Sequence, residues 1–225
     1  MLRMAYFYNY TSMMKNFHKV TIFILLFASF GNITAQNWDI ETLHSINSNQ
    51  NKFLKKYSLT ISDYTSTVAY ATPIVMGTMA LMKWDKELLY STLTVSSSIA
   101  LNQILTAQSK KIINRPRPYE TYPDLIQPYA VMHDKSMPSG HTSTAFNLAT
   151  SVSLEFPKWY VIAPSYFWAA SVGYSRMNLG VHYPSDVLTG AVLGAGSAFL
   201  TYKISRYLQH KGKNKKMLSL NDNWY

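Results

Sequence analysis

Long uncharged segments constrain the fold of this chain more than any other feature of its sequence. Residues 66–82, 88–109, 159–175 and 187–202 contain no Asp, Glu, Lys or Arg, and residues 141–154 are equally uncharged but rich in Thr, Ser and Asn. None of these segments shows the sustained alternation of apolar and polar residues that marks a half-buried strand. We therefore predict an all-α bundle, with the polar 141–154 segment buried among the other helices.

The composition favours a bundle that is embedded in a membrane. Only 14% of the residues are charged, against about 25% in a typical soluble domain. The mean hydropathy of −0.07 is nevertheless modest for a chain built mostly of spanning helices. Gly190 and Gly194 have the GxxxG spacing that lets two helices approach closely, and we interpret them as packing residues. Cysteine is absent, which excludes disulfides and thiolate-bound zinc.

The N-terminus resembles a secretory signal. Within residues 14–35, two lysines precede an apolar centre at residues 20–30, and the tripeptide Ile-Thr-Ala that ends at Ala35 suits a cleavage site. We predict that residues 1–35 are an N-terminal extension followed by a signal peptide. The alternative is an uncleaved first transmembrane helix, for which the apolar centre is short.

The alternation of segments predicts which connections share a side of the membrane. We expect a polar exported segment at residues 36–64, the catalytic bundle at 65–205 and a basic tail at 206–225. If the N-terminus starts inside, the connections at 110–140 and 175–186 both lie on the outer side. The basic tail then returns to the cytoplasm, in agreement with the positive-inside rule.

The net charge of +10 is concentrated near the C-terminus. Nucleic-acid binding is one interpretation of a basic tail. However, this tail directly follows an apolar segment, and its basic core lacks interleaved aromatic residues. We therefore predict contact with the membrane surface and no nucleic-acid partner.

Three motifs lie beside the ends of apolar segments, all on the predicted outer side. They read Lys-x6-Arg-Pro, Pro-Ser-Gly-His and Ser-Arg-x5-His-x3-Asp, with their chemical groups at Lys110, Arg117, Ser139, Gly140, His141, Arg176, His182 and Asp186. The long connection between the first two motifs is rich in proline and too polar to span a membrane. Long loops in compact domains are usually functional.

The cations of these motifs predict a phosphate site. Lys110, Arg117 and Arg176 adjoin apolar segments without a matching run of acids, which is costly unless an anion joins them. Arginine binds tetrahedral oxyanions with two donors at once. Ser139 and Gly140 open a helix, so we expect their backbone N–H groups and the serine hydroxyl to add donors.

The two histidines predict the reaction. A neutral His182 imidazole is a nucleophile, and Asp186 can orient it by accepting the N–H of the other ring nitrogen. Because Tyr183 precedes a proline, we expect His182 in a turn and Asp186 in the first helical turn beyond it. His141 is placed to give a proton to the departing alkoxide. The acids of the long loop lack metal-ligand spacing, so we predict no metal and no other cofactor.

Taken in order, the three motifs resemble those of the type 2 phosphatidic acid phosphatase (PAP2) superfamily. Every defining position is filled, and the resemblance covers about residues 65–205. It implies a PAP2-type helical bundle with its active site at the helix ends. It also implies a metal-independent phosphatase that hydrolyses a lipid phosphate or diphosphate, with a phosphohistidine at His182, a general acid at His141 and an orienting Asp186. The resemblance further implies that the phosphate is held by Lys110, Arg117, Ser139, Gly140 and Arg176.

Two other functions use the same groups. One is a soluble periplasmic acid phosphatase of broad specificity, and the other is a vanadate-dependent haloperoxidase, in which His182 would ligate vanadate. For the lipid phosphatase we expect a bacterial cytoplasmic membrane with the active site facing the periplasm. The residues leave the lipid substrate and the oligomeric state open.

Several arginine, histidine and aspartate residues outside the motif positions are assigned no role. Arg115 also precedes a proline, but its distance from Lys110 does not fit the motif. His133 and Asp134 lie in the long loop, and we assign them no substrate contact. His18, His44 and His210 have no motif around them.

Overall fold

The structure is a computed structural model that describes residues 34–48 and 51–221. These residues form helices and loops, and no strand occurs among them, which confirms the predicted all-α class. The chain divides into two units, residues 1–41 and 42–225. The apolar centre of the predicted signal lies outside the described residues, so the predicted cleavage is not tested.

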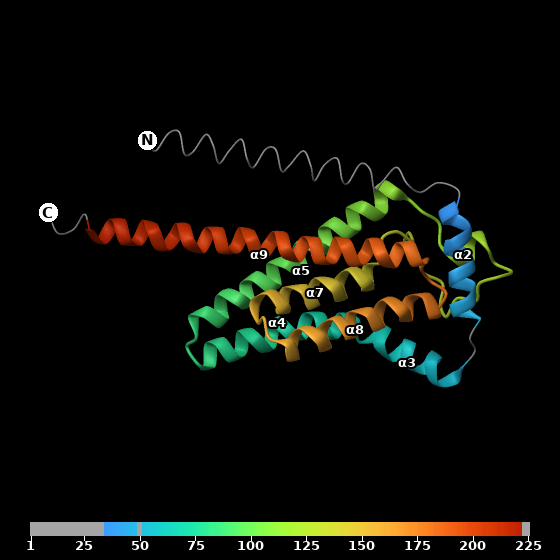
Figure 1. The fold of residues 1–225 in the computed structure, drawn as a ribbon, viewed down its shortest axis with the longest axis horizontal. Coiled ribbons are helices and arrows are strands. Elements are labelled where there is room, and N and C mark those ends of the chain that lie inside the picture. The colour runs from blue at the N-terminus through green and yellow to red at the C-terminus, as the bar shows by residue number, and fades with distance from the viewer. Residues whose placement is uncertain (1–33, 49–50, 222–225) are drawn as a thin grey trace. The chain divides into compact units, whose positions relative to one another are not determined.

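The helices follow the predicted segments closely. They are α2 (Thr34–Asn47), α3 (Lys52–Asp63), α4 (Thr65–Met82), α5 (Lys86–Ile113), α6 (Pro118–Thr121), α7 (Gly140–Glu155), α8 (Trp159–Asn178) and α9 (Pro184–Asn221). Each of the five uncharged segments lies within one of the long helices α4, α5, α7, α8 and α9 (Figure 1). Helix α9 continues through the basic residues to Asn221, so the expected boundary after residue 205 falls inside one helix.

Helix α7 is the central element of the second unit. It packs against α4, α5, α8 and α9. On one side, Ala145 and Ala149 of α7 meet Ala169 and Val172 of α8, and all four side chains are fully buried. Small side chains allow these two helices to lie close together, as they do in membrane bundles.

Helix α9 meets α7 through glycines. A Cβ at Gly194 would lie 2.1 Å from the carbonyl oxygen of Ser143, and a Cβ at Gly190 would lie 2.7 Å from that of Ser139. Both distances are too short for any side chain. The structure therefore confirms that these glycines are packing residues, and their contact fixes the start of α9 against the start of α7.

The interior of the bundle is polar where α5, α7 and α9 meet. The Asn147 side-chain amide donates to the hydroxyls of Ser98 (2.7 Å) and Ser197 (2.9 Å), and the Ser143 hydroxyl donates to Asn102 (2.6 Å). These amides and hydroxyls lower the mean hydropathy of the three helices that contribute them. Among the described helices, one segment, Pro184–Gln209, is apolar and long enough by itself to cross a membrane.

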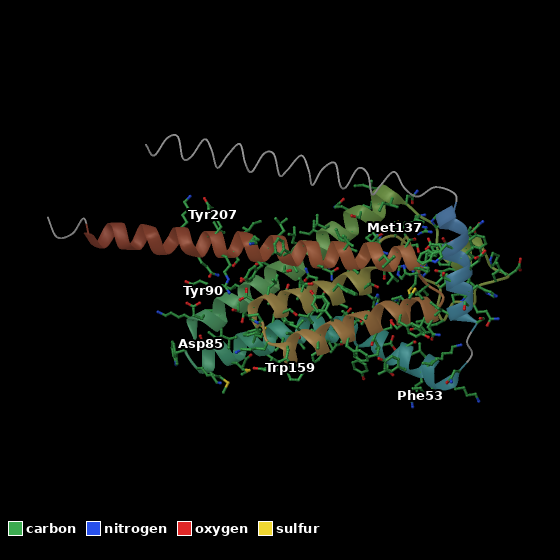
Figure 2. All side chains as sticks on the ribbon, viewed as in Figure 1. Phe53, Asp85, Tyr90, Met137, Trp159 and Tyr207 are labelled. Atoms are coloured by element: carbon green, nitrogen blue, oxygen red, sulfur yellow. The ribbon has the colours of Figure 1, made fainter. Side chains whose placement is uncertain are left out.

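The helix ends that carry the motifs lie together. Helices α5 and α8 end, and α7 and α9 begin, at the same end of the bundle, as the alternation of segments predicts (Figure 1). Met137, beside the second motif, marks this end, whereas Asp85 and Trp159 lie at the opposite end (Figure 2).

Replacing Gly194 with alanine should destabilise the protein, because the new methyl group must push α9 away from α7. We expect a loss of about 1–3 kcal/mol in the free energy of unfolding, the usual scale for overpacking. The matched control is Gly196→Ala, where nothing lies within 4 Å of the added Cβ and helix propensity favours alanine by about 1 kcal/mol. Thermal unfolding in detergent should show a lower midpoint for Gly194→Ala alone, and equal midpoints would contradict the packing role.

Candidate active site

The first motif is held at the end of α5 and the start of α6. Lys110 lies in the last turn of α5, which ends at Asn114 in the left-handed conformation (φ 50°). Arg117 precedes Pro118, the first residue of α6, and its backbone N–H donates to the Glu120 carboxylate at 2.8 Å. Proline suits a first helical position because no N–H is needed there. These local bonds hold the Arg117 backbone in place.

The Arg117 guanidinium connects the first motif to the third. Its side chain is only 2% exposed. One terminal nitrogen donates to the Val181 carbonyl oxygen at 2.7 Å and lies 3.4 Å from Nε2 of His182, while Nε donates to the Asp134 carbonyl oxygen at 2.9 Å. Two segments that are far apart in the sequence thus place a cation directly beside an imidazole nitrogen.

His182 and Asp186 have the predicted placement. His182 lies in the turn between α8 and α9, where Gly180 adopts a positive φ of 69°, and Asp186 lies in the first turn of α9. Nδ1 of His182 is 3.5 Å from Oδ2 of Asp186, an ion-pair distance that is longer than a typical hydrogen bond. The Asp186 side chain is fully buried, and its Oδ2 also accepts the Tyr183 N–H at 2.9 Å. The carboxylate therefore faces one ring nitrogen and leaves Nε2 toward Arg117.

Arg115, to which the sequence analysis gave no role, contacts this pair. Its terminal nitrogen donates to Oδ1 of Asp186 at 2.8 Å, and its guanidinium lies 3.9 Å from the centre of the Tyr183 ring. The hydroxyl of Ser136 donates to Oδ2 of Asp186 at 2.5 Å. The spacing rule excluded Arg115 from the phosphate site, and no local pattern in the sequence identified its contact with Asp186.

The second motif lies at the start of α7, and one part of the prediction for it is wrong. Ser139 is the N-cap residue, but its backbone N–H donates to the carbonyl oxygen of Asp186 at 3.0 Å and is not available to an anion. Its hydroxyl accepts a hydrogen bond from Thr142 at 2.9 Å. The following N–H groups of Gly140 and His141 have no acceptor within the helix, because the first-turn donors of an α-helix lack one.

Gly140 lies next to the first motif. A Cβ added to it would be 4.0 Å from Cε of Lys110 and 3.8 Å from a methyl carbon of Thr106. These are ordinary contact distances, so the glycine is not forced by crowding in the protein itself.

Arg176, like Arg117, is a deeply buried cation of the three motifs. It is 2% exposed, and its Nη1 donates to the hydroxyl of Ser62 on α3. Its Nε has no hydrogen-bond partner among the described residues. The charges of Arg176 and Lys110 both act on His141, so the second motif faces cations of the first and third.

The charge of His182 follows from its surroundings. Complete burial is the main cause that lowers its pKa to about 4, and Arg176 and Arg117 lower it further, while Asp186 acts in the opposite direction. The ring is therefore neutral at every pH above about 4. With Nδ1 facing Asp186, the lone pair of Nε2 points to the cations.

Asp134 overturns the expectation that the cations lack an acidic partner. Its carboxylate lies 2.8 Å from Nζ of Lys110 and 2.5 Å from a terminal nitrogen of Arg117, although the side chain is 60% exposed. Burial alone would raise its pKa, but hydrogen bonds and charge from Lys110 and Arg117 lower it to about 2. No spacing rule selects this residue from the long loop.

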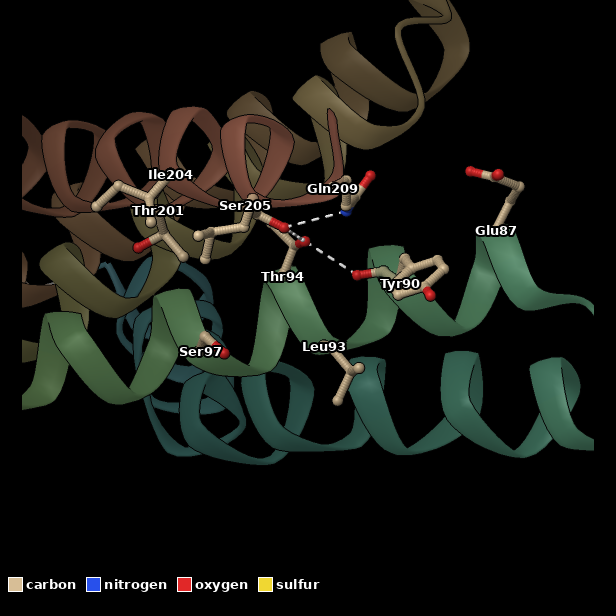
Figure 3. A pocket seen from close by; sticks show the side chains of 10 residues that line it. Glu87, Tyr90, Leu93, Thr94, Ser97, Thr201, Ile204, Ser205 and Gln209 are labelled. Carbon is tan, nitrogen blue, oxygen red and sulfur yellow. Dashed lines mark hydrogen bonds between the residues drawn. The ribbon is translucent and has the colours of Figure 1, made fainter. Parts of the chain in front are cut away.

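A large pocket elsewhere in the bundle has none of this chemistry. It lies between α5 and α9 with a volume of about 600 Å³, and a hydrogen bond of 2.6 Å joins Thr94 to Ser205 inside it (Figure 3). Tyr90, Leu93 and Gln209 also line it, and no motif residue does. The motif end of the bundle is therefore the candidate active site.

The comparison with known families agrees with this site. Residues 91–210 match the model of the PAP2 superfamily, and they include all three motifs. The chain belongs to the PAP2 superfamily. An undecaprenyl-diphosphatase and a lipid A phosphatase are among the curated proteins that the chain resembles, and the chain is a PAP2-type phosphatase.

Two curated relatives and one solved structure define the similarity more closely. An undecaprenyl-diphosphatase of Sulfolobus acidocaldarius is 30% identical over 88% of this chain and 91% of its own length. A lipid A 4'-phosphatase of Bacteroides thetaiotaomicron is 25% identical over 56% of this chain and 58% of its own length. The transmembrane PAP2-type phosphatidylglycerolphosphate phosphatase of Bacillus subtilis has a TM-score of 0.67 at 24% identity, over 84% of this chain and 94% of that one.

The low pKa of His182 can be measured directly. In protein labelled with isotopes in histidine, the His182 ring signals should titrate near pH 4, below the ordinary value of about 6.5, because burial and the two arginines disfavour the charged ring. The signals are assigned by their loss in His182→Ala. A midpoint near pH 6.5 would show that the ring is solvated and is not placed as described.

Proposed function

We propose that this protein hydrolyses the terminal phosphate of a lipid phosphate or diphosphate through a phosphohistidine at His182. The observation that carries the proposal is the placement of His182. Its Nδ1 faces the buried carboxylate of Asp186, and its Nε2 lies 3.4 Å from the Arg117 guanidinium. A neutral nucleophile, an orienting acid and an anion-binding cation thus meet at one imidazole ring.

The first chemical step forms the phosphoenzyme. The lone pair of Nε2 attacks phosphorus, and the bond from phosphorus to the leaving oxygen breaks with its electron pair. Burial and the charge of Arg176 lower the pKa of His141 to about 3 in the absence of a ligand, so His141 takes up its proton when the anionic phosphate binds beside it. It then gives that proton to the leaving oxygen, which releases the lipid as an alcohol or as a monophosphate. Asp186 stabilises the positive charge that develops on the His182 ring, as the acid of a catalytic triad does.

The second step releases phosphate. A water molecule gives a proton to the now neutral His141 while its oxygen attacks phosphorus. The bond from phosphorus to Nε2 then breaks, which returns His182 to its neutral form and frees inorganic phosphate. Through both steps the phosphoryl oxygens need donors that hold their negative charge. In this proposal they are the side chains of Lys110, Arg117 and Arg176, the hydroxyl of Ser139 and the N–H of Gly140.

The relatives favour a polyprenyl diphosphate as the substrate. The undecaprenyl-diphosphatase of S. acidocaldarius matches nearly the whole chain, whereas the lipid A 4'-phosphatase matches little more than half of it. Undecaprenyl diphosphate is therefore the first substrate to test. The phosphate groups of lipid A are the second candidate, supported by the shared catalytic region.

The surface of the bundle supports a membrane enzyme. Large apolar side chains are exposed along α4, α8 and α9, among them Ile74, Phe167 and Val192. Trp84 and Trp159 are exposed at the end away from the motifs, where an aromatic belt would meet a membrane interface. We place the motif end toward the periplasm, because the opposite end leads into the basic C-terminal residues.

His182→Ala should abolish both turnover and a covalent intermediate, since it removes the proposed nucleophile. Purified protein is mixed briefly with undecaprenyl diphosphate labelled at the terminal phosphate and quenched without acid, because a phosphohistidine is acid-labile and base-stable. We expect label on the wild-type protein and none on His182→Ala.

The matched control is His141→Ala, which keeps the nucleophile. It should lose activity on a lipid monophosphate, whose alkoxide leaving group needs a proton, but should still become labelled by an aryl phosphate with a good leaving group. A labelled His182→Ala protein would refute the mechanism. Bromination that requires vanadate and peroxide, without phosphatase activity, would favour the haloperoxidase. Release from membranes by high salt alone would favour the soluble acid phosphatase.

Activity should survive chelation, because cations and N–H donors are proposed to neutralise the phosphate. Among residues 34–48 and 51–221, no three His, Asp or Glu side chains gather in a metal-binding group. The measurement is hydrolysis of undecaprenyl diphosphate before and after dialysis against EDTA. A loss of activity that Mg²⁺ restores would contradict this account.

A further inference from the structure

The long loop places a carboxylate between two of the cations proposed to bind phosphate. Asp134 bridges Lys110 at 2.8 Å and Arg117 at 2.5 Å, with one oxygen directed at each. A tetrahedral phosphate bound by the same two side chains would set two of its oxygens in similar positions. The carboxylate and the phosphate cannot both hold these donors.

We propose that the Asp134 carboxylate competes with the substrate phosphate for Lys110 and Arg117, so that the phosphate must displace it. Asp134 then sets how much negative charge a ligand needs in order to enter the site. This inference rests on the proposed function, since it takes Lys110 and Arg117 as phosphate ligands. It gives the loop residue a role in specificity, although the carboxylate takes no part in the chemistry.

The negative charge of a ligand, compared with that of Asp134, decides whether the ligand can displace this carboxylate. The Asp134 carboxylate carries one negative charge and stays ionised above pH 2, so acid does not remove it under ordinary conditions. A phosphate monoester carries about 1.5 to 2 negative charges at pH 7 and gains by replacing it. A phosphodiester, the linkage in most membrane phospholipid headgroups, carries one charge and gains little. Terminal phosphates are therefore admitted and the surrounding diesters are held off.

The backbone around Asp134 allows the side chain to leave without unfolding the loop. Its carbonyl oxygen accepts from Nε of Arg117 at 2.9 Å, and the carbonyl oxygen of Lys135 accepts from Lys110. The next N–H, of Ser136, donates to the Arg115 carbonyl oxygen at 3.0 Å. These bonds do not involve the carboxylate, whose side chain is 60% exposed. Rotation of that side chain toward solvent is sufficient for displacement.

The test is Asp134→Asn, which keeps the shape and removes the charge. Inhibition constants are measured for inorganic phosphate and for dimethyl phosphate, a diester with one charge. Both should fall by a factor of about 10 to 100, the scale of hydrogen bonds to charged groups. Dimethyl phosphate should thereby change from a negligible to a measurable inhibitor. Unchanged or larger constants would overturn the inference, because Asp134 would then only support the loop.

The matched control is Asp124→Asn, which removes an exposed carboxylate from the same loop. At 1 M salt the screening length is about 3 Å, so the loss of a distant charge has little effect. The gain in Asp134→Asn should persist at this salt, and Asp124→Asn should match the wild type. Equal gains in both variants would mean that general electrostatics, not displacement, controls binding.

A second readout does not depend on turnover. Calorimetry of inorganic phosphate binding should show the same tighter binding in Asp134→Asn, whether or not the lipid substrate has been found. If the wild-type protein hydrolyses no lipid phosphate while this difference holds, the proposed function fails and the competitor stands. If the lipid is hydrolysed and inorganic phosphate binds both proteins equally, the proposed function stands and the competition by Asp134 is refuted.

Discussion

The buried carboxylate of Asp186 is the interaction on which the rest of the site depends. Its side chain faces His182 and accepts hydrogen bonds from Arg115 and Ser136, while its backbone oxygen accepts the N–H of Ser139. All three motifs and the long loop therefore meet at one residue. A buried carboxylate is tolerated only when such donors surround it, so the cost of burial selects a single arrangement of the segments.

The glycine contact between α7 and α9 makes this arrangement possible. Gly190 brings the start of α9 against the carbonyl oxygen of Ser139, one residue before α7 begins. Asp186 lies one helical turn earlier on α9, which is close enough for its backbone oxygen to reach the N–H of Ser139. Packing inside the bundle and geometry at the site are thus two results of the same close helix approach.

Much of this arrangement could be predicted from the sequence. Uncharged segments gave the helices, and motif spacing gave the residues that converge, including His182 in a turn and Asp186 in the first turn of α9. Contacts within the site could not be predicted in the same way. Arg115 reaches Asp186 because α5 ends in a left-handed residue, and the N–H of Ser139 is used because α9 lies so close. Both depend on tertiary distances that no local pattern encodes.

The balance of charge explains why the sequence argument from cations was incomplete. Lys110, Arg117 and Arg176 were expected to need an external anion, since no run of acids matches them in the sequence. In the folded chain, Asp134 comes from the same loop and pairs with the first two. Arg176 donates instead to a neutral hydroxyl, and its Nε has no partner among the described residues. In the proposed phosphate site, Arg176 is therefore the cation expected to contribute most to binding, because the loop acid does not bind its charge directly.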